Sequence, residues 1–255
     1  MKPVALHEML GENFFARVTA AQFNSLTKRY RNQDAAKDVS LDTLSDEQWQ
    51  SYFGAFTPFP DSFKTPLALC YHGHQFGIYN PEIGDGRGFL YAQLREDTTN
   101  RLLDLGTKGS GTTPFSRSGD GRLTLKGAVR EILASEYLNA LSVNSCKILS
   151  VFETEEQLHR NDEPSPTRAA VLVRLSHSHI RIGSFQRLAY LNQPQEILTL
   201  ARYVARYYYP DIDPESPPEA LLLGLLEALI ICVAEMVAGW MAAGFVHGVL
   251  NTDNF

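Results

Sequence analysis

The chain has 255 residues, of which 44% are hydrophobic and 11% aromatic, enough to bury one large core or two lobes and too many for a disordered protein. Its net charge of −6 argues against a broad nucleic-acid surface, because phosphate backbones demand clustered Lys and Arg. The three cysteines have no Cys-x-x-Cys spacing, and the N-terminus carries no export or targeting pattern, so we expect a reduced, cytoplasmic protein.

The first strongly patterned segment follows an N-terminal stretch, residues 1–60, in which short helical patterns and aromatics carry little recognisable chemistry. Residues 88–95 and 101–108 are apolar runs joined by the polar turn 96–100, which predicts a β-hairpin. The loop ahead of it contains Gly84 and Gly86, and glycines let backbone N–H groups approach a phosphate without a Cβ clash. A plain turn is the competing interpretation.

A lysine and a glutamate follow in an order typical of nucleotide-binding lobes. Lys108 ends the second strand, and apolar residues at helical spacing predict a helix over 125–141. Glu131 lies on the flank of its apolar stripe, where it could reach back to the lysine. A glycine loop, a strand lysine and a helix glutamate are the nucleotide-clamping parts of a protein-kinase N-lobe.

Two features in the middle of the chain leave alternatives open. A second glycine loop, 118–122, either caps the following helix or closes over a nucleotide. Arg174 and Arg181, on or beside a predicted buried strand at 169–175, either bind anionic oxygens or form structural salt bridges. The His-x-His pairs at 72–74 and 177–179 could ligate a metal, but no third ligand is nearby in sequence.

The C-terminal part is predicted to be helical. Residues 195–209 have helical spacing, 210–218 form a rigid Pro-rich linker, and 221–246 approach the length of a membrane-spanning helix. Because Glu227 and Glu235 lie inside this last stretch, we expect a buried core helix and no membrane partner.

The chain ends with the His-to-Asn frame of a protein-kinase catalytic loop, His247 to Asn254. In the pattern H-R-D-L-x-x-x-N the aspartate is the base and the asparagine holds a metal. Here Val249 replaces the aspartate, the asparagine is kept as Asn254, and a carboxylate, Asp253, stands directly before it. This combination predicts a nucleotide-and-metal site whose chemistry is not ordinary phosphorylation.

Several ordered blocks together resemble the selenoprotein O family of protein adenylyltransferases, pseudokinase-fold enzymes that transfer AMP from ATP to protein hydroxyls. The resemblance covers most of the chain from about residue 65, in GHQFG at 73–77, NPEIGDGRG at 80–88, LGTKGSGTTPFSRSGDGR at 105–122, REILASEYL at 130–138, SHIRIGSF at 178–185 and HGVLNTDN at 247–254. It implies a protein-kinase-like bilobal α+β fold. Residues 1–190 would form an N-terminal extension and a mixed N-lobe, and 191–255 the start of an incomplete helical C-lobe.

The resemblance also assigns roles to residues. It implies a flipped nucleotide whose α-phosphate faces a Ser, Thr or Tyr hydroxyl of a protein partner. Asp253 would accept the hydroxyl proton, Asn254 would bind Mg²⁺ (or Mn²⁺), and Glu131 would pair with the lysine. The nucleotide-binding residues would be Gly84, Gly86, Arg87, Lys108, Asp120, Gly121, Arg174 and Arg181.

One departure from the family pattern is the end of the chain at Phe255, before the second metal-binding acidic residue. We therefore expect a C-terminally truncated and catalytically silent chain, with an apolar face of the 221–246 helix left exposed. Three hypotheses follow: transfer of AMP from ATP, or of UMP from UTP; a true kinase, which Val249 disfavours; and a non-catalytic nucleotide-binding pseudokinase fragment.

Overall fold

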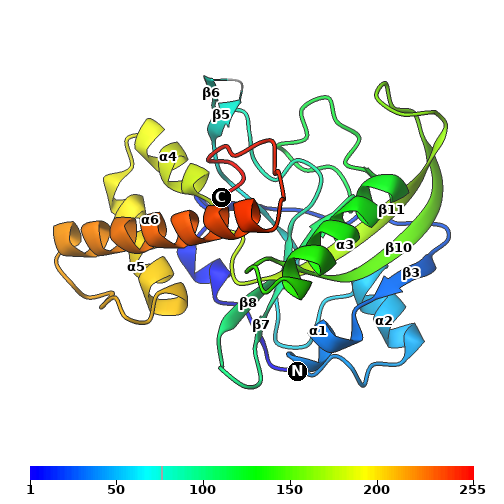
Figure 1. Ribbon diagram of the computed structural model, residues 1–255, viewed down its shortest axis with the longest axis horizontal. Coiled ribbons are helices and arrows are strands. Elements are labelled where there is room, and N and C mark those ends of the chain that lie inside the picture. Colours follow the sequence, from blue (N-terminus) through cyan, green and yellow to red (C-terminus); the bar gives the residue numbers. More distant parts are fainter. Residues whose placement is uncertain (76) are drawn as a thin grey trace.

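The computed structural model describes residues 1–75 and 77–255, so Phe76 of the 73–77 block lies outside the described residues. The fold is α+β, with one large antiparallel sheet in the order β2-β4-β7-β8-β11-β10-β3, to which β1 and β9 add at β7 and β11 (Figure 1). A separate hairpin, β5-β6, projects beside it. The mixed α+β class expected from the sequence is confirmed.

The elements have the following bounds. The strands are β1 Pro3–Val4, β2 Phe15–Arg17, β3 Thr27–Arg31, β4 Leu67–Leu69, β5 Gly73–Gln75, β6 Ile78–Asn80, β7 Leu90–Arg95, β8 Leu102–Lys108, β9 Leu123–Thr124, β10 Lys147–Leu158 and β11 Thr167–Ser176. The helices are a 3-10 turn at His7–Leu10, α1 Gln33–Lys37, α2 Asp46–Phe53, α3 Leu125–Ala140, α4 Ile182–Tyr190, α5 Pro194–Tyr208 and α6 Pro218–Ala242.

The predicted hairpin is confirmed as β7 and β8, and the predicted buried strand is β11, which pairs with β8 on one side and β10 on the other. Successive side chains of a strand point to opposite faces. On β11, Val171, Val173 and Leu175 pack in the cluster that also holds residues of α1 and α2, whereas Ala170 and Leu172 pack with α3. Arg174 therefore projects from the same face of the sheet as α3.

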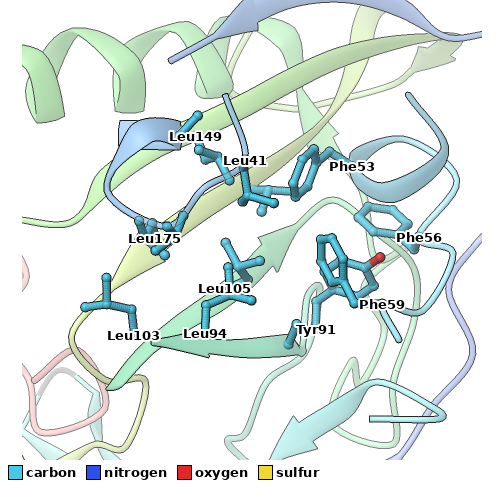
Figure 2. Close-up of a cluster of buried hydrophobic side chains, with 14 of the residues drawn as sticks. Leu41, Phe53, Phe56, Phe59, Tyr91, Leu94, Leu103, Leu105, Leu149 and Leu175 are labelled. Carbon is cyan, nitrogen blue, oxygen red and sulfur yellow. The ribbon is translucent and has the colours of Figure 1, made fainter. Parts of the chain in front are cut away.

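The N-terminal 60 residues, in which the sequence shows little chemistry, build much of the main core. Trp49 and Phe53 of α2 are fully buried, and the indole of Trp49 donates a hydrogen bond of 2.9 Å to Ser150 Oγ on β10. Figure 2 shows how Phe53, Phe56 and Phe59 meet the leucines of β7, β8 and β11. Burying each such side chain contributes roughly 1.5–3 kcal/mol to the stability of the fold. The N-terminal segment therefore covers and stabilises the face of the sheet opposite to α3.

The predicted helices at 125–141 and 195–209 are confirmed as α3 and α5, but the predicted burial of the long apolar helix is wrong. Leu221 and Leu225 of α6 pack against Ala201 and Ala205 of α5. Only 11% of the most apolar 18-residue window of α6 is buried, although the helix is long and apolar enough to cross a membrane by length and composition. Within the described part of the chain, α5 covers one side of α6, and this leaves most of its apolar surface in solvent.

A candidate nucleotide-binding site

The candidate site is a cavity of about 660 Å³ between the sheet, two glycine loops and the last residues of the chain. It brings together residues that are up to 183 positions apart, from Tyr71 to Asn254. Its lining includes all ten residues to which the resemblance assigns nucleotide, metal or proton chemistry: Gly84, Gly86, Arg87, Lys108, Asp120, Gly121, Arg174, Arg181, Asp253 and Asn254.

Positive charge is concentrated in this cavity, although the whole chain is acidic. Seven cationic side chains line it against three carboxylates. The cations are Arg87, Lys108, Arg117, Arg122, Arg160, Arg174 and Arg181, and the carboxylates are Asp85, Asp120 and Asp253. Arginine forks and lysine ammonium groups in such a concentration match the oxygens of a phosphorylated ligand.

The predicted clamp is present as an ion pair between Lys108 Nζ and Glu131 Oε1. Burial lowers the pKa of Lys108, Glu131 raises it, and the nearby Arg174 and Arg87 lower it again. Burial raises the pKa of Glu131, but Lys108, Arg174 and Arg87 together outweigh burial and hold the pKa below its ordinary value. One carboxylate thus faces three cations, and a bound phosphate would relieve their mutual repulsion.

The glycines of the first loop serve a purpose that the sequence analysis did not foresee. A Cβ on Gly84 would lie 2.4 Å from the ring of Phe115, and a Cβ on Gly86 would lie 2.8 Å from the Phe115 carbonyl oxygen. The hydroxyls of Thr113 and Ser116 donate to the carbonyl oxygens of Asp85 and Gly86. The missing side chains therefore allow two loops to pack as one unit along the cavity wall.

The second glycine loop does not cap α3. Thr124 is the N-cap, and its Oγ1 accepts from Gly127 N at 3.1 Å. Asp120 instead accepts two hydrogen bonds from the guanidinium of Arg160, at 2.8 and 3.0 Å, and Gly121 has a φ of +69°, which favours glycine. The capping interpretation is wrong for this loop, and Asp120 ties the loop to the β10–β11 connection.

Arg181 joins three segments that meet at the cavity. Its guanidinium donates to the backbone oxygen of Asp253, lies 3.4 Å from Asp85 Oδ1 and stacks 4.4 Å over the ring of Tyr71. Both interpretations of this residue stay open, since it lines the cation-rich cavity and also forms a salt bridge. Tyr71 and Arg160 carried no motif in the sequence and were missed there, and Asp85, although it lies in the first glycine loop, was given no role.

The kinase-like terminal loop is attached to the first turn of α4. Ile182 N and Gly183 N donate to the carbonyl oxygens of Phe255 and Thr252, each at 2.8 Å. These N–H groups belong to a helix start and have no partner inside the helix. A Cβ on Gly183 would lie 2.1 Å from His72 O, so the glycine also allows this close approach.

Asp253 is buried, and its Oδ1 has no hydrogen-bond partner among the described residues. The side-chain amide of Asn254 donates to Val249 O at 3.2 Å, which leaves its amide oxygen available. In the described part of the chain no three His, Cys, Asp or Glu side chains gather into a metal cluster, so the His-x-His pairs gain no third ligand. A hard cation here would depend on these oxygens, phosphate and water.

Almost the whole chain is similar to proteins of one known family. Residues 3–255 match the family model described as "Protein adenylyltransferase SelO". The protein nucleotidyltransferase YdiU of Trichormus variabilis is 51% identical over 249 residues, which cover 97% of this chain and 50% of the relative. The corresponding proteins of Synechocystis sp. and Vibrio vulnificus are 49% and 36% identical, with 97% of this chain and 51% and 49% of the relatives covered. The chain thus spans about half the length of these curated relatives.

Proposed function

This chain belongs to the SelO family of protein adenylyltransferases, and we propose that it forms the nucleotide-binding part of an enzyme that transfers AMP from ATP to Ser, Thr or Tyr hydroxyls of proteins. The observation that carries the proposal is the cation-rich cavity that Lys108, Arg174 and Arg181 line together with the buried Asp253. A kinase-like lobe arrangement is part of the same proposal, and it is supported by the Lys108–Glu131 ion pair.

The reaction follows from these groups. The acceptor hydroxyl oxygen forms a bond to the α-phosphorus, the bond to the pyrophosphate oxygen breaks, and the hydroxyl proton passes to Asp253. Negative charge grows on the phosphate oxygens and on the leaving pyrophosphate, where preorganised cations stabilise it most effectively. A positioned base is typically worth about 10²–10⁴-fold in rate, so removing Asp253 should be less damaging than removing several cations.

Magnesium, with manganese as the alternative, fits the oxygens that the structure offers. Asn254 would hold it through its amide oxygen, and the adjacent residue Asp253 offers an Oδ1 that has no hydrogen-bond partner among the described residues. Mg²⁺ is commonly held by one or two protein oxygens together with substrate phosphates and water. When bound, it would supply positive charge to the phosphate oxygens.

UMP transfer from UTP is a second candidate, because the contacts named above address phosphates and leave the base unread. Phosphoryl transfer is the third, and it lacks support because exposed Val249 stands where a kinase has its aspartate base. A non-catalytic nucleotide-binding role would use the same cavity.

Intact-protein mass spectrometry separates these candidates. A version of the chain extended to the length of its curated relatives is incubated with Mg²⁺ and either ATP or UTP, together with a mixture of acceptor proteins. We expect an adenylyl increment on the extended protein itself or on an acceptor, and none with the 255-residue chain alone. A uridylyl increment alone would favour the second candidate, and a phosphoryl increment would overturn nucleotidyl transfer. Nucleotide binding without any increment would favour the non-catalytic role.

Lys108→Ala tests the clamp. We expect this variant to bind ATP at least about tenfold more weakly, because a charge-assisted contact to phosphate is lost, while thermal unfolding changes little. Lys126→Ala is the matched control, since Lys126 lies on α3 with a side chain that is 60% exposed and outside the cavity lining. Titration calorimetry with ATP gives both affinities. Equal affinities for the two variants would remove Lys108 from the site.

A further inference from the structure

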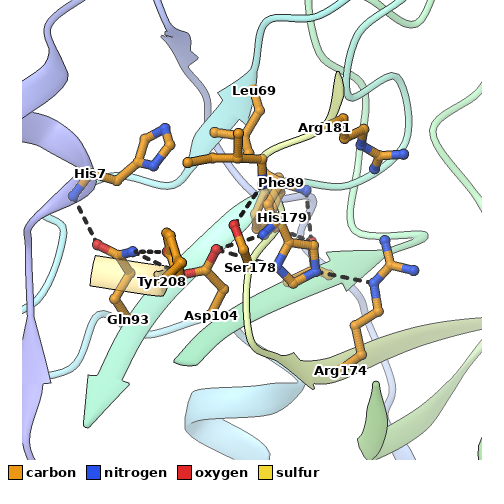
Figure 3. Close-up of polar contacts among 12 residues, drawn as sticks. His7, Leu69, Phe89, Gln93, Asp104, Arg174, Ser178, His179, Arg181 and Tyr208 are labelled. Atoms are coloured by element: carbon orange, nitrogen blue, oxygen red, sulfur yellow. Dashed lines mark hydrogen bonds and ion pairs between the residues drawn. The ribbon is translucent and has the colours of Figure 1, made fainter. Parts of the chain in front are cut away.

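A buried carboxylate behind the cavity has no role in the proposed reaction. Asp104 of β8 is fully buried. It accepts hydrogen bonds from Gln93 Nε2 at 2.8 Å, from His179 N at 2.8 Å and from the Tyr208 hydroxyl at 3.3 Å (Figure 3). Burial alone would raise the pKa of Asp104, but the interactions with His179 and Gln93 lower it below its ordinary value. Asp104 is therefore an ionised group inside the protein, held by three donors.

His179 connects this carboxylate to the cavity. Its Nδ1 lies 3.6 Å from Asp104 Oδ2, and its Nε2 accepts a hydrogen bond of 3.2 Å from Arg174 Nε. Only a ring without a proton on Nε2 can accept that bond. Burial lowers the pKa of His179, as does the charge of Arg174, against the opposing effect of Asp104. The imidazole is thus neutral and has its acceptor nitrogen directed at the arginine.

The sheet register leaves the space that this ring occupies. Asp104, Gly106 and Lys108 project from one face of β8, and Gly106 pairs with Arg174 of β11. A Cβ on Gly106 would lie 2.1 Å from His179 Nε2, so no residue with a side chain would leave the ring in place. The glycine inside this strand marks the close approach of a neighbouring side chain.

Fixing Nε leaves the two terminal nitrogens of Arg174 for a ligand. The side chain lines the cavity, and no described residue accepts a hydrogen bond from Nη1 or Nη2. Glu131 already interacts electrostatically with Arg174 and would compete for the guanidinium if Nε were released. A guanidinium held at Nε presents a planar pair of donors that matches phosphate oxygens.

From this geometry we propose that His179, fixed by Asp104 and accommodated by Gly106, is a positioning residue that directs the guanidinium of Arg174 at the nucleotide phosphates. The proposal rests on the proposed function for its ligand. It assigns to His179, one of the His-x-His pair at 177–179, a structural purpose that requires no metal.

A double-mutant cycle tests whether His179 acts through Arg174. His179→Phe keeps a ring over Gly106 but removes the acceptor, so ATP affinity should fall by about tenfold, the scale of one hydrogen bond to a charged group. In an Arg174→Met background the same change should have no further effect. His179→Gln places an amide oxygen near the former Nε2 and should restore most of the affinity. An equal loss in both backgrounds, or no recovery with glutamine, would overturn the proposal.

A second measurement does not depend on nucleotide binding. An N–H···N hydrogen bond transmits a ¹⁵N–¹⁵N scalar coupling, which NMR should detect between Arg174 Nε and His179 Nε2 in the unliganded protein. We expect Asp104→Asn to weaken this coupling, because the fixed carboxylate that holds His179 N is lost. No coupling in the wild type, with Arg174 Nε–H exchanging as fast as that of Arg117, would overturn the proposal. A wild type that shows the coupling but binds no ATP would contradict the proposed function and leave the hydrogen bond standing.

Discussion

At the level of single residues, the site depends as much on side chains that are absent as on those that are charged. Gly84 and Gly86 allow the first loop to contact Phe115 and Ser116, and Gly106 makes room for His179. Each of these contacts joins segments that are far apart in sequence or on different elements. These glycines therefore allow close packing between protein segments, in addition to the contact with a nucleotide that is predicted for Gly84 and Gly86.

Gly84→Ala should be destabilising by about 1–3 kcal/mol, the usual cost of an added methylene in a well-packed region, because its Cβ would lie 2.4 Å from the ring of Phe115. ATP affinity should fall as well, since the displaced loop carries Arg87. Thermal unfolding and titration calorimetry measure the two effects. Phe115→Leu in the same chain should restore part of both.

Gly224→Ala is the control for that substitution. The nearest atom to its added Cβ would be at 3.8 Å, an ordinary contact, and alanine is the better helix former. Its stability should be equal to or above that of the wild type. If Gly84→Ala behaves like Gly224→Ala, the packing role of the first loop is refuted.

Contacts between side chains on regular elements could be predicted from the sequence, and contacts made by side chains in loops could not. Lys108 and Glu131 stand at a strand end and on a helix flank, where periodicity fixes their direction, and they pair as expected. Arg160 reaches the cavity from the connection between two strands, and Asp85 is defined by its contacts with Leu69 N and Arg181. No local pattern encodes such contacts, because the partners are 16 to 96 residues away.

At the level of elements, those with a complete local pattern could be predicted, and those that depend on a distant partner strand could not. The β7–β8 hairpin and the helix α3 were predicted because their patterns are complete within about 20 residues. Strand β3, Thr27–Arg31, was not predicted, since it is short and pairs with Ser150–Glu153 of β10 more than 100 residues later. Strand propensity depends on such neighbours, so a five-residue edge strand has a weak signal of its own.

The carboxylate of Glu153 connects three neighbouring strands, β3, β10 and β11. Glu153 of β10 accepts hydrogen bonds from Arg168 of β11 at 2.6 Å and from Arg29 of β3 at 2.7 Å. The bond from Arg168, followed by that from Arg29, lowers the pKa of Glu153 from 4.5 to about 2, against the effect of burial. The ionised form is thus favoured in the folded state, and its stabilising contribution is complete above pH 4.5.

Glu153→Gln should therefore change the acid dependence of stability. As pH falls from 4.5 to 2 the unfolded chain binds this proton before the folded one, so the wild type loses stability in that window. The variant should be less stable than the wild type at pH 7, with a difference that shrinks toward pH 2. Urea unfolding at several pH values measures it. Glu219 is exposed and has no ion pair among the described residues, so Glu219→Gln should show the same pH dependence of stability as the wild type. If Glu153→Gln also shows the wild-type pH dependence, the stabilising role of the Glu153 ion pairs is refuted.

At the scale of the whole molecule, the apolar surface is unevenly covered. The sheet is packed on both faces, by α1 and α2 on one side and α3 on the other. In helix α6, Leu221 and Leu225 pack against α5, whereas the side chain of Leu226 is 53% exposed and that of Ile230 is 59% exposed. Contiguous exposed apolar surface of this kind is unusual on a monomer and favours association.

The isolated 255-residue chain should therefore bind a hydrophobic dye and self-associate as its concentration rises. Replacing Leu226 and Ile230 by lysine should reduce both signals without lowering the unfolding temperature, because these side chains contact solvent. Leu225→Lys should do the opposite, since it buries an unpaired charge against α5 and weakens the contact between the two helices. Dye fluorescence, analytical ultracentrifugation and thermal unfolding distinguish the two effects. A chain that stays monomeric and binds no dye would show that α6 is covered in solution. If the chain co-sediments with lipid vesicles and the double lysine variant does not, the apolar face of α6 binds a bilayer, and the expectation of no membrane partner is wrong.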